Sequence, residues 1–309
     1  MKALPLILVL AIVPFFGLIN SCDKVENAYP EKIEIDTTLY PGVWSNYIAN
    51  EYPQFQQNTN TDINVLLEDY TGHKCNNCPP AGEIANTIHE NNPDRVFVAA
   101  IHVDPGANLS FQSAETSGSY STDHTNPDVL EYGITFQNGF NFLGNPQGTV
   151  NRKTVDGKMF DFSGSWETRT SNILNENNLR YNLQSDFNFF ESTNGGYLHV
   201  EAEKLVEQNA NINMVVYVIR DTLTDWQTMP NNSSNEFYLH KDIHIGSIDN
   251  QPWGQPVFSA EDTQGTKLVR DYSYEVPADE VMENLHFLIY LYNTETYEIY
   301  HVIKQRLTE

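Results

Sequence analysis

The chain has 309 residues, with 41 acidic and 17 basic side chains and a formal net charge of −24. So few Lys and Arg side chains disfavour nucleic acid as a partner, because phosphate recognition needs clustered basic groups. The acidic residues are scattered rather than gathered in a tail, so we interpret the charge as a solubilising surface. Hydrophobic residues make up 40% of the sequence, which is typical of a globular protein, and the length allows two domains.

The N-terminus has the pattern of a targeting segment. Lys2 supplies a positive charge, and residues 6–18 carry no charged side chain, a run too short to span a membrane. The segment ends in Leu18-Ile19-Asn20-Ser21-Cys22, which resembles a lipobox, in which cleavage leaves a lipidated Cys22. Asn20 is unusual at its position, so a plain signal peptide is the alternative. We therefore expect residues 1–21 to be a signal peptide and an acyl chain on Cys22 to bind the membrane.

The next part of the chain predicts a tether followed by a β-α-β unit. Residues 22–60 are polar and rich in proline, and we expect a tether with one short strand at 32–35. The apolar runs 63–67 and 96–103 predict strands buried on both faces. Between them, apolar residues at helical spacing predict a helix, which a proline pair opens (Pro79, Pro80, Ala81, Ile84, Ala85 and Ile88). This order predicts two parallel strands joined by a helical crossover.

The pattern of the sequence changes near residue 178. Before it, we expect a domain over residues 61–177 with a polar insertion at 104–144. That insertion carries a helix near 128–132, and a strand and a closing helix follow it (149–152 and 166–175). After it, helical periodicity is nearly absent and six strands are predicted (198–202, 214–219, 238–245, 267–275, 285–292 and 297–303). Their spacing predicts an antiparallel, immunoglobulin-like β-sandwich over residues 178–309.

Cysteine usage singles out one chemical site. If Cys22 carries lipid, Cys75 and Cys78 have no other intramolecular partner. A bond between residues so close in sequence restrains the unfolded chain little, so a purely stabilising role explains the pair poorly. At the start of a helix, the partial positive charge stabilises a thiolate on the first cysteine. The second cysteine lies one turn further on, within reach of a mixed disulfide.

The setting of this pair resembles the thioredoxin superfamily. A buried strand leads into Cys75-Asn76-Asn77-Cys78. Asp69, six residues before Cys75, matches the partly buried acid that handles protons in that superfamily, and Pro146 matches its cis-proline beside the substrate groove.

A closer resemblance is to lipoproteins related to the 28 kDa outer-membrane protein of Gram-negative bacteria. It rests on Glu68-Asp69-Tyr70-Thr71-Gly72-His73-Lys74-Cys75-Asn76-Asn77-Cys78-Pro79-Pro80 and on Gly144-Asn145-Pro146-Gln147-Gly148-Thr149-Val150-Asn151-Arg152. The resemblance implies a lipid anchor in the outer membrane, facing either the periplasm or the outside. It also implies a thioredoxin-like domain and a β-rich C-terminal domain.

Two functions from different classes follow. In the first, Cys75 attacks a disulfide of an exported protein, Cys78 resolves the mixed disulfide, and Asp69 assists proton transfer. Pro146, Lys74 and His73 then border the substrate groove. In the second, the protein is a non-catalytic surface binding or scaffolding lipoprotein with an envelope partner and a structural Cys75–Cys78 disulfide. Lys74 favours the second function, because an aromatic residue usually stands before the first cysteine.

The remaining candidate groups imply no cofactor and no metal. His73, Cys75 and Cys78 could supply three metal ligands, but no second cysteine pair or nearby histidine completes a site. We interpret His240, Asp242 and His244 as a solvated strand face rather than a metal site. Asp69 has an alternative role as a cap of the turn before the helix.

Overall fold

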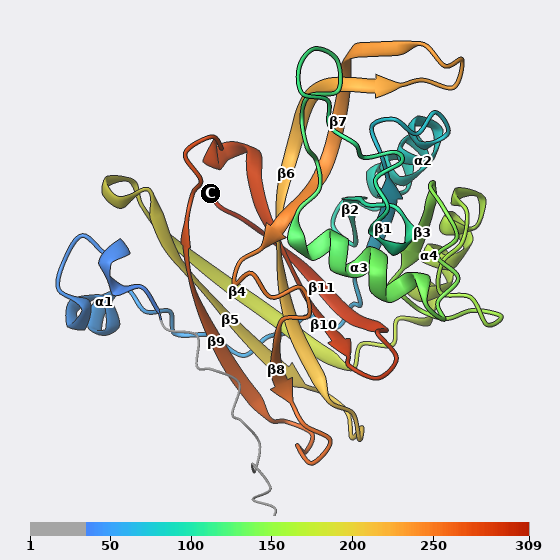
Figure 1. The fold of residues 1–309 in the computed structure, drawn as a ribbon. Coiled ribbons are helices and arrows are strands. Elements are labelled where there is room, and N and C mark those ends of the chain that lie inside the picture. The colour runs from blue at the N-terminus through green and yellow to red at the C-terminus, as the bar shows by residue number, and fades with distance from the viewer. Residues whose placement is uncertain (1–34, 309) are drawn as a thin grey trace, which may run out of the picture. The chain divides into compact units, whose positions relative to one another are not determined.

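In the computed structural model, which describes residues 35–308, the chain forms an eight-stranded sheet and a separate three-stranded antiparallel sheet (Figure 1). The strand order in the main sheet is β11-β10-β6-β7-β2-β1-β3, and β8 also pairs with β6. The order in the second sheet is β4-β5-β9. The predicted signal peptide, the lipidated Cys22 and most of the predicted strand 32–35 lie outside the described residues.

The elements have the following bounds. The main sheet contains β1 (Val65–Thr71), β2 (Val96–His102), β3 (Gln147–Val150), β6 (Ile212–Thr228), β7 (Ser234–Ser247), β8 (Gln255–Phe258), β10 (Leu285–Asn293) and β11 (Ile299–Arg306). The second sheet contains β4 (Tyr181–Phe190), β5 (Gly195–Lys204) and β9 (Lys267–Glu275). The α-helices among the described residues are α1 (Trp44–Asn50), α2 (Cys78–Glu90), α3 (Pro127–Gln137) and α4 (Trp166–Glu176).

The predicted β-α-β unit is present as β1, α2 and β2. β1 pairs in parallel with β2 from Val65↔Val96 onward, and β3 pairs with the other edge of β1 in the antiparallel sense. α2 begins with two prolines in its first turn, where a missing N–H costs least, and buries Ala81, Ala85 and Ile88. These side chains share a core with β1, β2 and α4, so this part of the sheet has its own apolar layer.

The strands after residue 178 do not form a sheet pair of their own. β2 and β7 pair in parallel at Ala100↔Ile243, so the main sheet runs from the first predicted domain into the second. A stand-alone immunoglobulin-like sandwich is therefore not confirmed. The physical reason is that β10 has no solvent-exposed face, as a strand of a two-sheet sandwich would have. It is buried along its whole length because both of its faces are covered.

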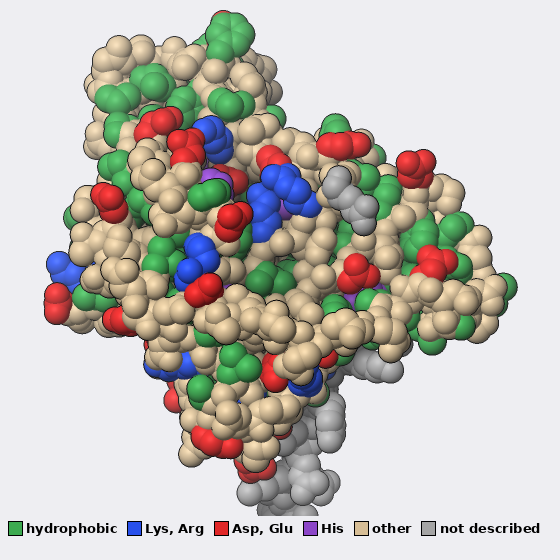
Figure 2. Space-filling view, turned by 180° about the vertical axis from the view of Figure 1, so that it is seen from behind, with side chains coloured by type: hydrophobic (Ala, Val, Ile, Leu, Met, Phe, Trp, Pro, Cys, Tyr) green, Lys and Arg blue, Asp and Glu red, His purple; other side chains and the backbone are tan. Residues whose placement is uncertain are grey.

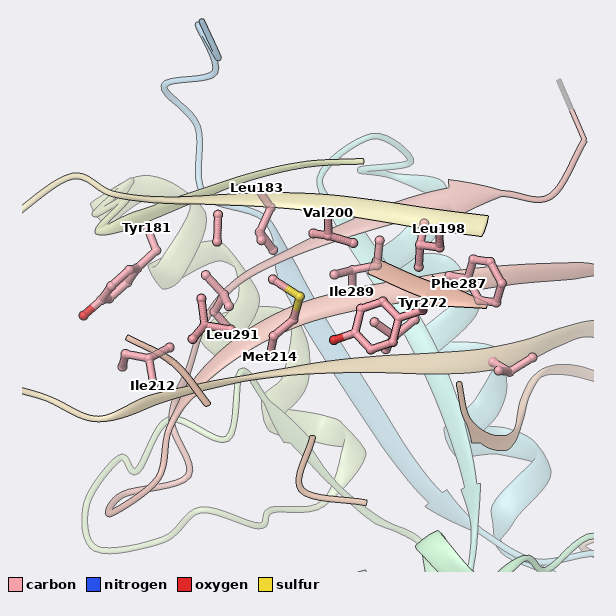
Figure 3. Close-up of a cluster of buried hydrophobic side chains, with 14 of the residues drawn as sticks. Tyr181, Leu183, Leu198, Val200, Ile212, Met214, Tyr272, Phe287, Ile289 and Leu291 are labelled. Atoms are coloured by element: carbon pink, nitrogen blue, oxygen red, sulfur yellow. The ribbon is translucent and has the colours of Figure 1, made fainter. Parts of the chain in front are cut away.

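Each face of β10 packs into a different core. Phe287, Ile289 and Leu291 face the second sheet, and their core includes Leu183 and Val200 (Figure 3). The alternate residues of β10 (Leu288, Tyr290 and Tyr292) belong to a core that contains side chains of α3. The second sheet thus covers one face of β10, while the main sheet, to which β10 belongs, continues into β2, β1 and β3.

The segments at 35–60 and 104–144 are more ordered than we expected. Residues 35–60 contain α1 and a 3₁₀ turn (Thr37–Leu39), and Tyr47 is fully buried beside Tyr197. The insertion contains α3, whose first turn is capped by the Asn126 side chain. Because α3 buries apolar side chains against the main sheet, the insertion is part of the core rather than a polar loop alone.

Candidate functional site

Cys75 and Cys78 form a disulfide at the start of α2. β1 ends at Thr71, and a short turn, in which Cys75 N donates to Gly72 O at 3.0 Å, brings the pair to the helix. Both cysteines are nearly inaccessible, with 1% of Cys75 and 2% of Cys78 exposed. The predicted pairing and place of the cysteines are therefore found, but the sulfur atoms are covered.

Part of this cover comes from the far end of the β6–β7 hairpin, which lies beside α2 in Figure 1. The Gln227 side-chain amide donates to Cys75 O at 3.0 Å and to Gly72 O at 3.3 Å. Thr228 N donates to His73 O at 2.8 Å. Asn76 and Asn232 are joined by a 2.9 Å hydrogen bond between their side chains. Sequence reasoning missed these residues, because the alternation in 238–245 indicates a strand but not what its hairpin contacts.

Asp69 lies inside β1 and is 4% exposed. It lines a cavity of about 40 Å³ together with Cys78, Gly82 and Tyr238, which is room enough for a water molecule. Its Oδ1 atom has no hydrogen-bond partner, and burial raises the pKa of the carboxyl group to about 7. Asp69 therefore shares a cavity with the second cysteine, and its side chain makes no hydrogen bond that would cap the turn before the helix.

The proline loop is fixed at the ends of the two parallel strands. The Asn145–Pro146 peptide bond is cis, as the resemblance implies. The Asn145 side-chain amide donates to Thr71 O, Val103 O and an oxygen of Asp104, at 2.9, 3.0 and 2.8 Å. Pro146 is half-buried beside them. The loop is thus held against the carboxyl ends of β1 and β2, the edge of the sheet at which the chain turns toward the cysteines.

Lys74 and His73 differ from their expected positions at a groove. The Lys74 ammonium contacts Ser113 Oγ at 3.1 Å and Glu115 Oε1 at 3.2 Å, so its charge is paired on the insertion. It also lies 5.3 Å from the ring centre of Tyr120. His73 is fully buried, and neither of its ring nitrogens has a hydrogen-bond partner. Burial lowers its pKa, so His73 is a neutral interior side chain rather than a group bordering an open groove.

His73 belongs to a buried cluster of four histidines. The ring centres of His102 and His124 are 4.8 Å apart, and those of His124 and His240 are 5.1 Å apart. The His73 ring lies 5.2 Å from that of His124, whose Nε2 is 3.2 Å from an oxygen of Asp225. Burial lowers the pKa of both His124 and His240 to about 4, and it also holds the pKa of His102 well below its ordinary value.

This cluster corrects our interpretation of residues 240–244. His240 and His244 are 4% and 0% exposed, so they do not form a solvated strand face. At Asp242 the backbone has φ of +50°, which interrupts the regular alternation between them, and His244 packs instead against Tyr217. Within the described residues, no three His, Cys, Asp or Glu side chains are arranged to hold a metal ion.

The surface shows no gathering of charge on the face seen in Figure 2. Acidic and basic side chains are interspersed there, in keeping with a solubilising role for the net charge of −24.

Two apolar side chains of the β6–β7 hairpin are exposed to solvent, Phe237 at 75% and Leu239 at 46%. Among residues 35–308, no helix is long and apolar enough to cross a membrane.

Together, the β1-α2-β2 unit, the cysteine pair at the start of α2 and the cis-proline define a thioredoxin-like fold. HBP35 of Porphyromonas gingivalis shares this fold, with a TM-score of 0.59 at 16% identity over 80% of this chain and 76% of that chain.

Two other solved structures are more distant. A protein from Agrobacterium tumefaciens gives a TM-score of 0.44 at 16% identity, covering 80% of this chain and 96% of that chain. A domain of the outer membrane lipoprotein Omp28 from Porphyromonas gingivalis gives a TM-score of 0.27 at 17% identity, covering 41% of this chain and 88% of that chain. No protein-family model matches the chain, and no curated protein sequence matches it.

Proposed function

We propose that this chain is a lipid-anchored envelope protein that exchanges thiols and disulfides with exported proteins through Cys75 and Cys78. The observation that carries the proposal is the position of Asp69. A buried carboxyl group with a raised pKa shares a small cavity with the second cysteine. A structural disulfide needs no such group, whereas a resolving thiol needs a base whose pKa is close to its own.

The reaction begins with the reduced pair. The Cys75 thiolate attacks one sulfur of a substrate disulfide, forming a mixed disulfide and releasing the other substrate sulfur as a thiolate. Cys78 gives its proton to Asp69, and its thiolate attacks Cys75 Sγ. This step releases the second substrate thiolate and forms the Cys75–Cys78 bond seen in the structure. Two electrons pass to the substrate, the two substrate thiolates take up protons, and Asp69 returns its proton to solvent.

The proposed location rests on the sequence. The motif that ends at Cys22 resembles a lipobox, and the two motifs at residues 68–80 and 144–152 resemble outer-membrane lipoproteins. The test is to replace Cys22 with Ala and to follow the protein in membrane and soluble fractions. Loss of lipid labelling together with release from the membrane supports the anchor, and unchanged membrane association contradicts it.

A second function is favoured by one specific observation. The cysteines are 1% and 2% exposed, which suits a permanent disulfide in a binding or scaffolding lipoprotein with an envelope partner. The two functions differ in the reduction potential of the pair, because structural disulfides resist reduction by glutathione whereas exchange-active ones equilibrate with it.

The deciding experiment equilibrates the mature protein in glutathione buffers and measures the Cys75–Cys78 potential. In parallel, Cys78→Ser is used to trap mixed disulfides on Cys75, and Cys75→Ser is the matched control that lacks the attacking thiol. A potential in the range of oxidoreductases, with proteins trapped by Cys78→Ser alone, supports exchange. A very low potential with nothing trapped supports the binding function instead.

A further inference from the structure

We propose that the far end of the β6–β7 hairpin, residues 226–237, is a movable cover, and that its opening controls access to the Cys75–Cys78 pair. We call these residues the hairpin cover. The inference concerns the regulation of the site and rests on the proposed exchange function. It comes from three observations: what the cover touches, how it is attached to the sheet, and how little it buries.

The cover contacts the peptide groups that flank the reactive sulfur. Gln227 donates to the carbonyl of Cys75 itself, and Thr228 N donates to the carbonyl of His73. A second contact is made between the two cysteines in the sequence, where the side chain of Asn76 donates to that of Asn232. Any protein that brings a disulfide to Cys75 needs this same space. The cover and a protein substrate therefore exclude each other.

The attachment of the hairpin changes along its length. β6 pairs with β10 only as far as Arg220, and β7 pairs with β2 at Ile243. Beyond these points, the two strands pair with each other and form a two-stranded ribbon. The pairing register shifts between Asp225 and Gln227, at the base of the cover. A ribbon of two strands is marginally stable by itself, and a bulge is a place where it bends.

The cover is held by a small set of polar contacts rather than by a large apolar core. The Tyr120 hydroxyl bonds to Thr228 Oγ1 at 2.8 Å and to Ser234 Oγ at 2.9 Å, joining the cover to the insertion. Phe237 is 75% exposed, and Trp226 at the base of the cover is only partly buried, with its ring centre 6.0 Å from that of Tyr120. Elements with few buried apolar contacts open locally at a lower free energy than the rest of a fold.

The experiment measures how fast a phosphine reductant reduces the disulfide of the folded protein, with thiol alkylation and mass spectrometry as the readout. Each attack by the phosphine on one sulfur, followed by hydrolysis, gives two thiols and one phosphine oxide. We expect Gln227→Ala and Tyr120→Phe each to increase the rate by about tenfold. The matched control is Thr224→Ala, an exposed residue on the same hairpin, and its rate stays within twofold of the wild type.

Urea separates opening of the cover from unfolding of the whole protein. Local opening exposes little surface, so the reduction rate then rises only weakly with urea, whereas global unfolding gives a steep dependence. A second variant replaces residues 226–237 with Asn-Gly, a two-residue turn that rejoins the paired residues Asp225 and Tyr238. If it retains cooperative thermal unfolding, we expect it to react faster than any point variant.

Two results overturn the proposal: rates that are equal in the wild type, Gln227→Ala and Tyr120→Phe, or a wild-type rate with the urea dependence of global unfolding. This result can be separated from the exchange function. The rate with phosphine measures access to the disulfide, whereas the glutathione equilibrium measures the reduction potential of the Cys75–Cys78 pair. Fast reduction of Gln227→Ala combined with a very low potential keeps the cover and removes the exchange function. Equal reduction rates in the wild type and the variants, combined with a potential in the oxidoreductase range, remove the cover and keep the exchange function.

Discussion

Arg152 and Glu68 form a fully buried ion pair, in which Arg152 Nε and Nη2 lie 2.8 and 2.6 Å from the two carboxylate oxygens of Glu68. The same guanidinium donates to the hydroxyls of Tyr217 and Tyr290, which belong to β6 and β10. Glu68 stands on β1, one residue before Asp69. The pair therefore ties the thioredoxin-like strands to the C-terminal strands and fixes the sheet beneath the site.

Removing one charge of this pair leaves the other unpaired in the interior. We expect Glu68→Gln to lower the free energy of unfolding by about 3–5 kcal/mol, because a buried guanidinium without its counter-charge is costly. Urea unfolding followed by circular dichroism measures the loss. The control is Glu176→Gln, which removes the half-exposed partner of Lys153 and should cost less than about 1 kcal/mol. Equal losses in the two variants contradict a structural role for the buried pair.

Asp69 makes the stability fall as the pH rises. Burial raises its pKa from 3.8 to about 7, so the folded protein keeps a proton that the unfolded chain releases above about pH 4. The cost of ionising the buried group therefore grows between about pH 4 and pH 7 and is fully present above pH 7. Asp69→Asn removes this cost, and we expect the variant to be more stable than the wild type at pH 8, by at most about 4 kcal/mol.

The measurement is urea unfolding of both proteins at pH 4, 6 and 8, with Asp94→Asn, which changes an exposed carboxylate, as the control. The difference between Asp69→Asn and the wild type should shrink toward pH 4. A constant difference at the three pH values means that the variant changes packing rather than proton binding. In the glutathione assay, the same variant should slow the release of mixed disulfides from Cys75 without preventing their formation.

The histidine cluster has the opposite effect on stability, which it lowers as the pH falls. Burial lowers the pKa of His240 to about 4, so between about pH 6.5 and pH 4 the unfolded chain binds a proton that the folded protein does not. Because the folded protein favours the neutral form of His240, the free energy of unfolding decreases as the pH falls through this range. His102 and His124 pack against the same ring, and Asp225 and Tyr238 lie beside it.

We expect His240→Gln to weaken this acid sensitivity. The fall in melting temperature between pH 7.5 and pH 4.5 should be smaller in the variant than in the wild type. His89→Gln is the control, since His89 lies at the partly exposed end of α2. An unchanged acid sensitivity in His240→Gln assigns the loss of stability to other groups.

The sequence predicts the thioredoxin-like elements well because their signals are local. The spacing of Ala81, Ala85 and Ile88 indicates α2, and the apolar run at 96–103 indicates β2. The positions of Asp69 and Pro146 follow from their distances to the cysteines along a fold that is already recognised. The roles of these residues stay predictions.

What the sequence does not predict is pairing over long separations. Gln227 meets Cys75 across 152 residues, and β2 joins β7 through the single pair Ala100↔Ile243. Strand alternation gives the face of each side chain but not its partner strand. The patterns of β6, β7 and β10 indicate strands and so predict a separate sandwich, but they do not show that β7 joins the sheet of β1 and β2. The cover, which decides whether the cysteines are accessible, is therefore visible only in three dimensions.

The last prediction concerns Tyr47, which anchors the segment expected to be a tether. Its ring packs against Tyr197 and Trp44, and its hydroxyl bonds to His199, which is held in turn by Asp271 at 2.7 Å. We expect Tyr47→Ala to free residues 35–60 and to cost about 3–5 kcal/mol, as loss of a buried aromatic ring does. Tyr47→Phe keeps the ring and should cost about 1 kcal/mol. Limited chymotrypsin digestion with mass spectrometry then finds cleavage within 35–60 in Tyr47→Ala alone. Continued protection of that segment in Tyr47→Ala contradicts the anchoring role, because packing elsewhere then suffices to hold it on the second sheet.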